Sequence, residues 1–184
     1  MSTPRSSRAG RTPRESRVEM VELVLPNDAN TLGNVLGGRV LHWIDLAAAI
    51  VAHRHCRQET VTVSLDQMSF LAPIRVGQLA VISARMTYTG RTSMEIRVDV
   101  ACEDLLTGER RPTSTAYLTF VAIDKQGRPA PVPPLILETE EERREARAAE
   151  GRREARLRAR PDHPHEPEPV PGHSPEHPGE TKHR

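Results

Sequence analysis

The sequence predicts an α+β fold in which an antiparallel sheet of about five strands wraps around one central helix. Three observations lead to this prediction: one long helix-like stretch, one strand-like run before it, and four strand-like runs after it. No helix-like pattern separates those four runs, so consecutive strands are expected to pair as hairpins in an antiparallel sheet. The expected order is strand, helix, then four strands.

The elements follow from the apolar runs and from the residues that interrupt them. Residues 18–25 are mostly apolar, and Pro26 ends this first strand. The polar loop NDANTLGN leads to VLGG and then to a helix over residues 39–55. The four later strands are expected over residues 60–72, 78–89, 93–105 and 111–124. The residues that mark the turns are Pro73, Gly77, Gly90 and the sequence TGER at 107–110.

The expected helix has no wide polar face. Within LHWIDLAAAIVA, residues 41–52, apolar side chains go round most of the cylinder. Such a helix is buried, and because only one sheet is available, the sheet must curl around it. At roughly 1.5 Å per residue the helix is about 25 Å long, close to the width of such a sheet. An antiparallel sheet wrapped around one central helix is the hot-dog arrangement.

Composition divides the 184 residues into one domain and three flanking segments. Residues 1–18 are rich in arginine and contain little to bury, which predicts a disordered basic arm. Residues 19–137 are expected to form the hot-dog domain. Residues 138–160 mix acids and arginines around one large apolar side chain, Leu157, a pattern compatible with a solvated helix held by i,i+4 pairs. Residues 161–184, rich in Pro, His and Glu, are expected to be disordered.

Charge and composition argue against several classes of protein. The formal net charge is +1 and there are only five aromatic residues, which does not favour a nucleic-acid-binding domain. No apolar run is long enough for a membrane span or placed to make a signal peptide. The arginine- and serine-rich arm leaves a transit peptide open, although it lacks an apolar face. Cys56 and Cys102 are too few for a zinc site or a disulfide framework, so we expect a cytoplasmic protein without a metal.

Asp45 is the one carboxylate in the apolar helix. No Arg or Lys lies one turn away on the same helix to neutralise it. An unpaired carboxylate in a core costs several kcal/mol, a large share of a domain's typical ~5–15 kcal/mol of stability. Two interpretations are open. Either Asp45 reaches solvent or is capped by a strand side chain such as Ser64 or Arg85, or it faces a site shared with another subunit and does chemistry there.

Gly37 and Gly38 stand directly before the expected helix. Two residues without side chains at a helix start let a ligand approach the exposed N–H groups, whose dipoles favour a developing negative oxygen. An oxyanion hole is one interpretation of this pair. The other is that the glycines serve only the conformation of a tight turn.

Together these features resemble a known family. The stretches PNDANTLGNVLGGRVLHWIDLAAAIVAHRHC, VTVSLDQMSFLAPIRVGQ, MTYTGRTSMEIRVDV and GRPAPVPPL occur in this order. They are similar to the acyl-CoA thioesterases of the hot-dog superfamily, in particular the cytosolic acyl-CoA hydrolase and YciA-like group, from residue 21 to residue 135. The family's loop asparagine falls on Asn30, its helix aspartate on Asp45, and its glycine pair on Gly37 and Gly38. Some members have an acid where this chain has Asn27 and a histidine where it has Leu36.

The resemblance implies hydrolysis of acyl-CoA to a free acid and CoA. Asp45 would act as general base or nucleophile, Asn30 would orient the water or the thioester, and the Gly38 N–H would hold the carbonyl oxygen. Asp45 and Gly38 are about 10 Å apart on an ideal helix, so one subunit cannot easily bring its own pair together. The resemblance implies a homodimer with composite sites, assembled further as a trimer of dimers. No cofactor is expected, because CoA is part of the substrate.

Recognition of CoA is expected at a turn with basic and hydroxyl residues. The sequence TGRTS offers Thr89, Gly90, Arg91, Thr92 and Ser93, with Arg91 as the best phosphate candidate. Further candidates for binding the substrate are Gly37, Ser64 and Arg54. The alternative is that TGRTS is only a hairpin turn with an exposed arginine.

Two other functional classes are left open by the sequence. A hot-dog hydratase or dehydratase would act on the same CoA esters but would need a catalytic histidine, for which His42 is the one candidate near Asn30 and Asp45. A non-catalytic acyl-CoA-binding regulator would keep the pocket without turnover. The presence of Asp45 favours the enzyme.

Overall fold

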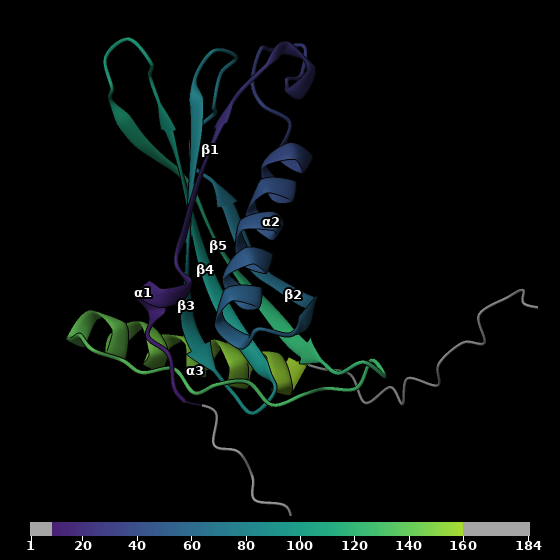
Figure 1. The fold of residues 1–184 in the computed structure, drawn as a ribbon. Coiled ribbons are helices and arrows are strands. Elements are labelled where there is room, and N and C mark those ends of the chain that lie inside the picture. Colours follow the sequence, from purple (N-terminus) through teal and green to yellow (C-terminus); the bar gives the residue numbers. More distant parts are fainter. Residues whose placement is uncertain (1–8, 160–184) are drawn as a thin grey trace, which may run out of the picture.

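The computed structural model describes residues 9–159, and its elements follow the predicted order (Figure 1). A short helix α1 (Pro13–Ser16) precedes strand β1 (Val18–Leu23), a 3-10 turn (Pro26–Asp28) and the long helix α2 (Gly37–Cys56). Strands β2 (Glu59–Phe70), β3 (Leu79–Thr89), β4 (Ser93–Glu103) and β5 (Arg110–Ile123) come next, and helix α3 (Glu140–Ala159) follows them. The expected tail at residues 161–184 lies outside the described residues.

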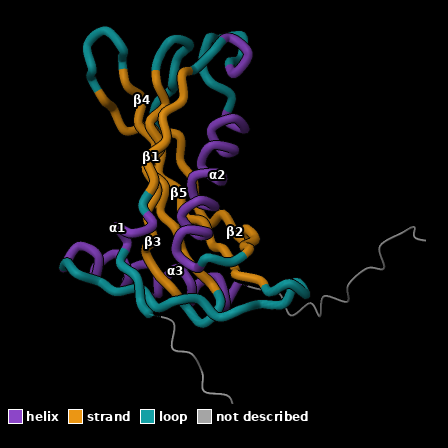
Figure 2. Tube along the Cα trace, viewed as in Figure 1, coloured by secondary structure: helices purple, strands orange, loops and turns teal. Residues whose placement is uncertain are grey.

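The five strands form one antiparallel sheet in the order β1-β3-β4-β5-β2. Helix α2 lies against one face of this sheet, and α3 crosses behind it (Figure 2). Apolar side chains of α2, among them Ile44 and Val51, share a buried core with Ile82, Ile96 and Phe120 from three strands. Because alternate strand residues point to opposite faces, every second residue of β3, β4 and β5 supplies this core. The predicted hot-dog fold is confirmed.

One face of α2 is not covered by the sheet. Leu41 and Leu46 are 36% and 42% exposed, and Gly38, His42 and Asp45 lie on the same exposed side. The expectation that the whole helix is buried was therefore wrong for a single chain. The sequence pattern counted apolar residues around the helix, whereas one concave sheet face reaches only part of the cylinder.

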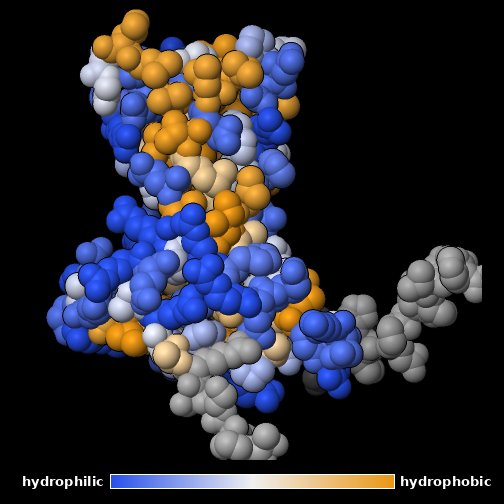
Figure 3. All heavy atoms as spheres, in the orientation of Figure 1, coloured by the Kyte–Doolittle hydropathy of each residue, from blue (hydrophilic) through white to orange (hydrophobic). Residues whose placement is uncertain are grey.

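Exposed apolar side chains also gather around the N-terminal end of α2 and the neighbouring loops, at the upper end in Figure 3. They include Leu32, Leu36, Leu71 and Leu106, of which Leu106 is 97% exposed. The lower half of the same view, where α1 and α3 lie, is predominantly hydrophilic (Figure 3). Among residues 9–159, no helix is long and apolar enough to cross a membrane.

The N-terminal segment is ordered further toward its start than the disordered arm that we expected over residues 1–18. The Arg11 N–H donates to the Pro134 carbonyl, and the Ile136 N–H donates back to the Arg11 carbonyl. Pro13 and Ser16 of α1 are buried. Backbone pairing with the segment after β5 fixes residues that have few apolar side chains of their own, so composition alone does not reveal it.

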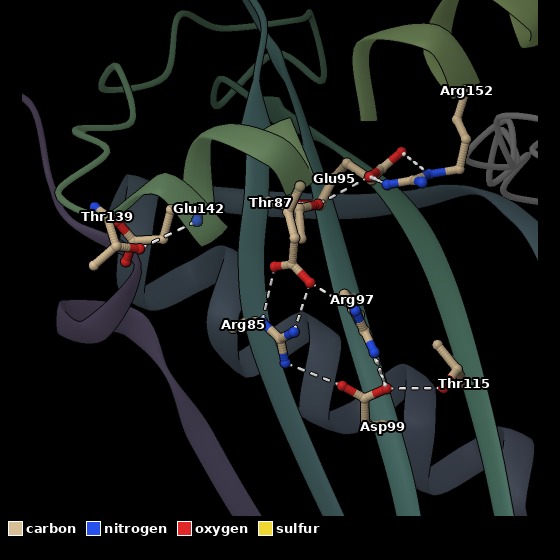
Figure 4. A network of polar contacts seen from close by, with 10 residues as sticks. Arg85, Thr87, Glu95, Arg97, Asp99, Thr115, Thr139, Glu142 and Arg152 are labelled. Carbon is tan, nitrogen blue, oxygen red and sulfur yellow. Dashed lines mark hydrogen bonds and ion pairs between the residues drawn. The ribbon is translucent and has the colours of Figure 1, made fainter. Parts of the chain in front are cut away.

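Helix α3 forms where a charged helix was expected, but it is docked on the outer sheet face rather than solvated (Figure 4). Glu145 accepts hydrogen bonds from Arg85 and Arg97, both at 2.6 Å, and Asp99 bridges the same two arginines. Burial alone would raise the pKa of Glu145, but the two guanidinium groups lower it overall. The outward-facing charges of β3 and β4 thus form the surface on which α3 packs.

A second group of ion pairs fixes the C-terminal half of α3. Glu95, with a side chain only 1% exposed, accepts hydrogen bonds from Thr87 and Arg152. Arg156 pairs with Asp66 and lies 3.5 Å from Glu95. The Arg152 guanidinium also stacks 3.8 Å from the centre of the Tyr117 ring. Paired charges and stacked guanidinium groups therefore hold α3 on the sheet, although this helix has no apolar stripe.

His55, near the C-terminus of α2, is fully buried. Its Nε2 lies 3.0 Å from the Pro133 carbonyl oxygen, and an N–H is needed to bind a carbonyl, so Nε2 carries the proton. Nδ1 is buried without a partner among the described residues. Burial lowers the pKa of His55 below its usual value.

His55 is expected to make stability depend on pH. As pH falls through about 6.5, His55 binds a proton in the unfolded chain but stays neutral in the folded chain. The free energy of unfolding therefore falls by at most ~1.4 kcal/mol per pH unit. His55→Gln keeps an N–H donor without titrating and should flatten this slope. Urea unfolding from pH 5 to 7.5 at one protein concentration measures it, with exposed His42→Gln as the control. An unchanged slope in His55→Gln would contradict the assignment.

Candidate active site

The N-terminus of α2 has open backbone donors. Its first residues are Gly37 and Gly38, so the glycines lie inside the helix rather than before it. The preceding residue, Leu36, has no side-chain oxygen to cap them, and the N–H groups of Arg39 and Val40 both bind the Leu36 carbonyl. The N–H groups of Gly37 and Gly38 have no acceptor among the described residues. A Cβ atom on Gly38 would meet nothing within 4 Å, so a ligand can approach this backbone closely.

Asn30 is held in the loop before α2 by its own side chain. Its Oδ1 accepts hydrogen bonds from the Leu32 N–H at 2.9 Å and the Asn34 N–H at 3.2 Å. The Gly33 N–H closes the turn on the Asn30 carbonyl, and Gly33 adopts a φ of +75°, which a glycine accepts without strain. Because Oδ1 is occupied, the exposed Asn30 amide NH₂ is the group left to donate to a ligand.

Asp28 connects this loop to the helix. Its Oδ1 lies 2.8 Å from the Arg39 guanidinium, and its carbonyl accepts the Leu36 N–H. Arg39 in turn lies over the Trp43 ring, 5.5 Å from the ring centre. The loop that carries Asn30 is therefore anchored to the first turns of α2.

Asp45 is exposed on the uncovered face of α2, and Thr62 of β2 holds it in place. The Thr62 hydroxyl donates to Asp45 Oδ1 at 2.9 Å. The two expected capping residues have other partners: Ser64 donates to Asp66 at 2.5 Å, and Arg85 binds Glu145 and Asp99 on the outer face. A strand side chain does cap Asp45, but a different one from those considered.

A β-bulge explains why Thr62, and not Ser64, reaches Asp45. Thr62 pairs with Phe120, a core residue that faces α2, whereas Ser64 pairs with Thr119 on the opposite face. The register shift between Thr62 and Ser64 inserts one residue, so two positions that strict alternation would put on one face are separated. The sequence carries no evident signal for this bulge, and Thr62 was missed for that reason.

The TGRTS residues form the turn between β3 and β4, near the C-terminal rather than the N-terminal end of α2. Thr89 accepts the Leu135 N–H, the Gly90 N–H binds the Ser93 carbonyl, and backbone carbonyls of Arg91 and Thr92 also accept hydrogen bonds. The Arg91 side chain is exposed and has no ionic partner among the described residues. This turn and the glycine pair lie at opposite ends of the helix within one chain.

Three of the predicted binding residues, Ser64, Thr92 and Ser93, line one cleft of about 810 Å³ between β2, β5 and α3. We call it the β2–α3 cleft. Thr119, Arg153 and Arg156 also line it. Arg54 was predicted to bind CoA as well, but its guanidinium donates to the Arg17 carbonyl at 3.0 Å and so holds the N-terminal segment.

An apolar pocket of about 370 Å³ lies beside the start of α2. Gly37, Val40, Phe70 and Ile74 are among its lining residues. A Cβ atom on Gly37 would lie 3.4 Å from the Phe70 ring, an ordinary van der Waals contact. Within residues 9–159, no cluster of three His, Cys, Asp or Glu side chains could hold a metal ion. His42 is exposed on α2.

Comparison with known proteins connects this geometry to a family. The family model described as Thioesterase superfamily matches residues 32–109. YkhA, an uncharacterized acyl-CoA thioester hydrolase of Bacillus subtilis, is 45% identical over 129 residues, which cover 70% of this chain and 75% of YkhA. The cytosolic acyl coenzyme A thioester hydrolase of Rattus norvegicus is 38% identical over 74% of this chain, but the match spans only 36% of that longer protein.

Solved structures agree with these relatives. A hexameric acyl-CoA thioesterase is 42% identical with a TM-score of 0.79, and the match covers 82% of this chain and 97% of that one. An acyl-CoA hydrolase of Staphylococcus aureus, in complex with butyryl coenzyme A and coenzyme A, is 33% identical with a TM-score of 0.76 over 81% and 91% of the two chains. Alanine variants of that hydrolase at an aspartate, an asparagine and a threonine match at 32% identity. The chain therefore belongs to the acyl-CoA thioester hydrolases of the hot-dog thioesterase superfamily.

Proposed function

We propose that the protein hydrolyses the thioester of acyl-CoA to a free acid and CoA. The observation that carries this proposal is the Asp45 carboxylate, exposed on the uncovered face of α2 and fixed there by the Thr62 hydroxyl. A carboxylate that serves only stability would gain little at this position, because Asp45 is exposed to solvent and accepts a single hydrogen bond from the described residues. An oriented and accessible carboxylate suits a general base or a nucleophile.

The site is proposed to be shared between two chains. Along α2, Asp45 lies seven residues from Gly38, roughly 10 Å, too far for both to contact one thioester. A second copy packed on the uncovered α2 face with its helix antiparallel would bring its Asn30 and glycines toward Asp45. The exposed Leu41 and Leu46 supply apolar area for such packing, and the hexameric relative supports assembly as a trimer of dimers.

The Gly38 N–H, Asn30 and Asp45 each have a proposed role in the reaction. The thioester carbonyl oxygen accepts the open N–H of Gly38, which stabilises the negative charge of the tetrahedral intermediate. The free NH₂ of Asn30 orients the attacking water or the thioester. Asp45 either takes a proton from the water as it attacks, or attacks the carbonyl carbon itself to form an anhydride that water then opens. In both routes the C–S bond breaks and the CoA thiolate leaves and takes up a proton.

The alanine variants of the Staphylococcus aureus hydrolase support these assignments by their spacing. Its replaced asparagine and aspartate are 15 positions apart, and the aspartate and threonine are 17 apart. Asn30, Asp45 and Thr62 have the same two spacings in this chain. Thr62 is therefore proposed as a positioning residue for Asp45.

Replacing Thr62 by valine is expected to lower kcat by about ten-fold, because the carboxylate loses the hydrogen bond that orients it. The KM for acyl-CoA should change little, because Thr62 is proposed to orient the carboxylate and not to bind the substrate. Thr60→Val on the same strand, where Thr60 contacts His53, is the matched control. Equal kcat in both variants and wild type would remove Thr62 from the mechanism.

The substrate is proposed to extend in two directions from the thioester. The apolar pocket beside Gly37, walled by Phe70 and Val40, suits an acyl chain. The turn of Thr89, Gly90, Arg91, Thr92 and Ser93 is proposed to contact the CoA part, with the exposed Arg91 near its phosphates. No cofactor is proposed, and a cytoplasmic location agrees with the cytosolic relative.

A thiol-release assay across acyl-CoAs of increasing chain length tests the function. Release of free CoA with multiple turnovers is the expected result. A hydratase would instead change the absorbance of an enoyl-CoA without releasing thiol, and a regulator would bind acyl-CoA without turnover. Either of these outcomes would replace the proposal.

A further inference from the structure

We infer that Asp66 of β2 and Arg156 of α3 are positioning residues for the proposed hydrolysis. Their ion pair lies on the outer face of the sheet, whereas the hydrogen bond between Thr62 and Asp45 lies on the α2 side. The ion pair holds β2 in the bulged register that turns Thr62 toward Asp45. The inference rests on the proposed function, because it concerns the same carboxylate.

Strand β2 has two bulges, one on each side of a short segment. Its pairing with β5 shifts by one residue between Thr62 and Ser64, and again between Leu65 and Met68. Regular alternation would put all four even-numbered residues from 62 to 68 on one face. Instead, Thr62 and Met68 face α2 and the core. Ser64 and Asp66 face outward, so the two bulges together turn one hydroxyl and one carboxylate away from the core.

The contact between Thr62 and Asp45 depends on the first of these bulges. Without the extra residue, and with the pairing from Ser64 onward kept, Val63 would lie opposite Phe120 in place of Thr62. A slip of one residue turns each side chain to the other face of the sheet. Valine has no hydroxyl to donate to Asp45. The register of β2 therefore decides whether the carboxylate is oriented.

Polar contacts on the outer face hold the bulged segment. Ser64 donates to Asp66 at 2.5 Å, which links the two residues that the bulges turn outward. Arg156 binds Asp66, and the two side chains are only 23% and 13% exposed. Because water reaches these groups only in part, their ion pair is stronger than one between exposed side chains. A return of Asp66 to the inner face would break this pair and place a carboxylate in the apolar core.

Arg156 is itself fixed by a second carboxylate. It lies 3.5 Å from Glu95, whose side chain is 1% exposed and is bound by Arg152 and Thr87. Glu95 belongs to β4 at the centre of the sheet, whereas β2 is an edge strand with one neighbour in the chain. An edge strand has no second ladder of hydrogen bonds to fix its register. Helix α3 therefore supplies the missing restraint by tying β2 to the central strand.

A double-mutant cycle with Thr62→Val tests the inference. Asp66→Ala is the suitable partner, because of the ion pair only Arg156 lines the β2–α3 cleft and can contact a ligand there. Asp66→Ala should lower kcat for acyl-CoA about three- to ten-fold and change KM by less than about two-fold, since the orientation of Asp45 is lost. In the Thr62→Val background it should have almost no further effect, because the hydroxyl that it positions is gone. Independent roles would instead multiply to a loss of about 30- to 100-fold.

Glu103→Ala is the matched control. Glu103 also pairs with an arginine, Arg110 of the neighbouring strand, and its side chain is 19% exposed. Its removal should leave kcat unchanged in both backgrounds. Amide hydrogen exchange followed by mass spectrometry gives a readout that needs no catalysis. Residues 59–70 should exchange about ten-fold faster in Asp66→Ala than in wild type, and at the wild-type rate in Glu103→Ala.

The inference is overturned if Asp66→Ala keeps the wild-type kcat, if it lowers kcat by the same factor with and without Thr62, or if residues 59–70 exchange at the wild-type rate. Wild type still releases thiol in each of these cases, so the thioesterase proposal stands. Absence of thiol release by wild type would instead remove the proposed function and the positioning role with it. Faster exchange of residues 59–70 in Asp66→Ala would then still show that the ion pair holds β2.

Discussion

Replacing Asp45 by asparagine is expected to lower kcat for acyl-CoA by about 10²- to 10⁴-fold, the usual contribution of a general base or nucleophile. Asparagine has nearly the same shape and can still accept the Thr62 hydroxyl, so the orientation of the side chain is kept. What disappears is the negative charge that takes up a proton or attacks the carbonyl carbon. The measurement is thiol release at saturating acyl-CoA, together with the unfolding midpoint.

Glu59→Gln is the matched control for this variant. Glu59 is an exposed carboxylate at the start of β2 that lies 3.6 Å from His53, and its removal should leave kcat unchanged. Because Asp45 is exposed, Asp45→Asn should unfold within about 0.5 kcal/mol of wild type. Hydrolysis by Asp45→Asn at close to the wild-type rate would end the assignment of Asp45 as the reacting group.

The order of the elements along the chain was predictable because breakers and apolar runs alternate clearly after residue 59. The expectation that all consecutive strands pair as hairpins was wrong for β2, which pairs with β5 and not with β3. Pro73, Gly77 and Gly90 stand in or next to the turns that separate β2, β3 and β4. The apolar character of α2 likewise required a sheet curved around it, since no second layer of helices was available. These features depend on patterns that each segment carries in itself.

The candidate site was less predictable, because it depends on contacts between segments. A bulge in β2 decides that Thr62, and not Ser64, reaches Asp45, and one inserted residue leaves no evident mark in the apolar pattern. The docking of α3 was missed for a related reason. Arg85, Arg97 and Asp99 look like a solvated sheet face until Glu145 is brought to them from a segment without an apolar stripe.

The exposure of Asp45 lowers the free-energy cost of placing a charged side chain on α2. In the sequence, a charge within an apolar helix suggested a carboxylate buried at a cost of several kcal/mol. In one chain the sheet leaves this face of α2 open, so Asp45 costs little until another surface covers it. A surface that covers Leu41 and Leu46 also surrounds the Asp45 carboxylate. Assembly and catalysis are therefore proposed to use the same face of α2.

Mixing an Asn30→Ala variant with an Asp45→Asn variant is expected to restore activity that neither has alone. In a two-fold dimer with shared sites, the mixed dimer has one site with intact Asp45 and Asn30 and one site that has lost both. Random exchange makes half of all dimers mixed, so recovery should approach about one quarter of wild-type activity. Exchange is achieved by co-expression or by unfolding and refolding the two variants together.

The control is the mixture of Asp45→Asn with Thr62→Val. These two residues touch within one chain, so they should belong to the same half of the shared site. One site of the mixed dimer then carries Asp45→Asn and the other carries Thr62→Val, so neither site keeps the Asp45 and Thr62 pair intact. Activity should therefore equal the average of the parent variants, without the excess expected for Asn30→Ala with Asp45→Asn.

The shared site is contradicted if the mixture of Asn30→Ala with Asp45→Asn shows no excess activity although mass analysis finds mixed dimers. Asn30 and Asp45 would then act within one chain. The roughly 10 Å between Gly38 and Asp45 would then have to be bridged by the substrate itself.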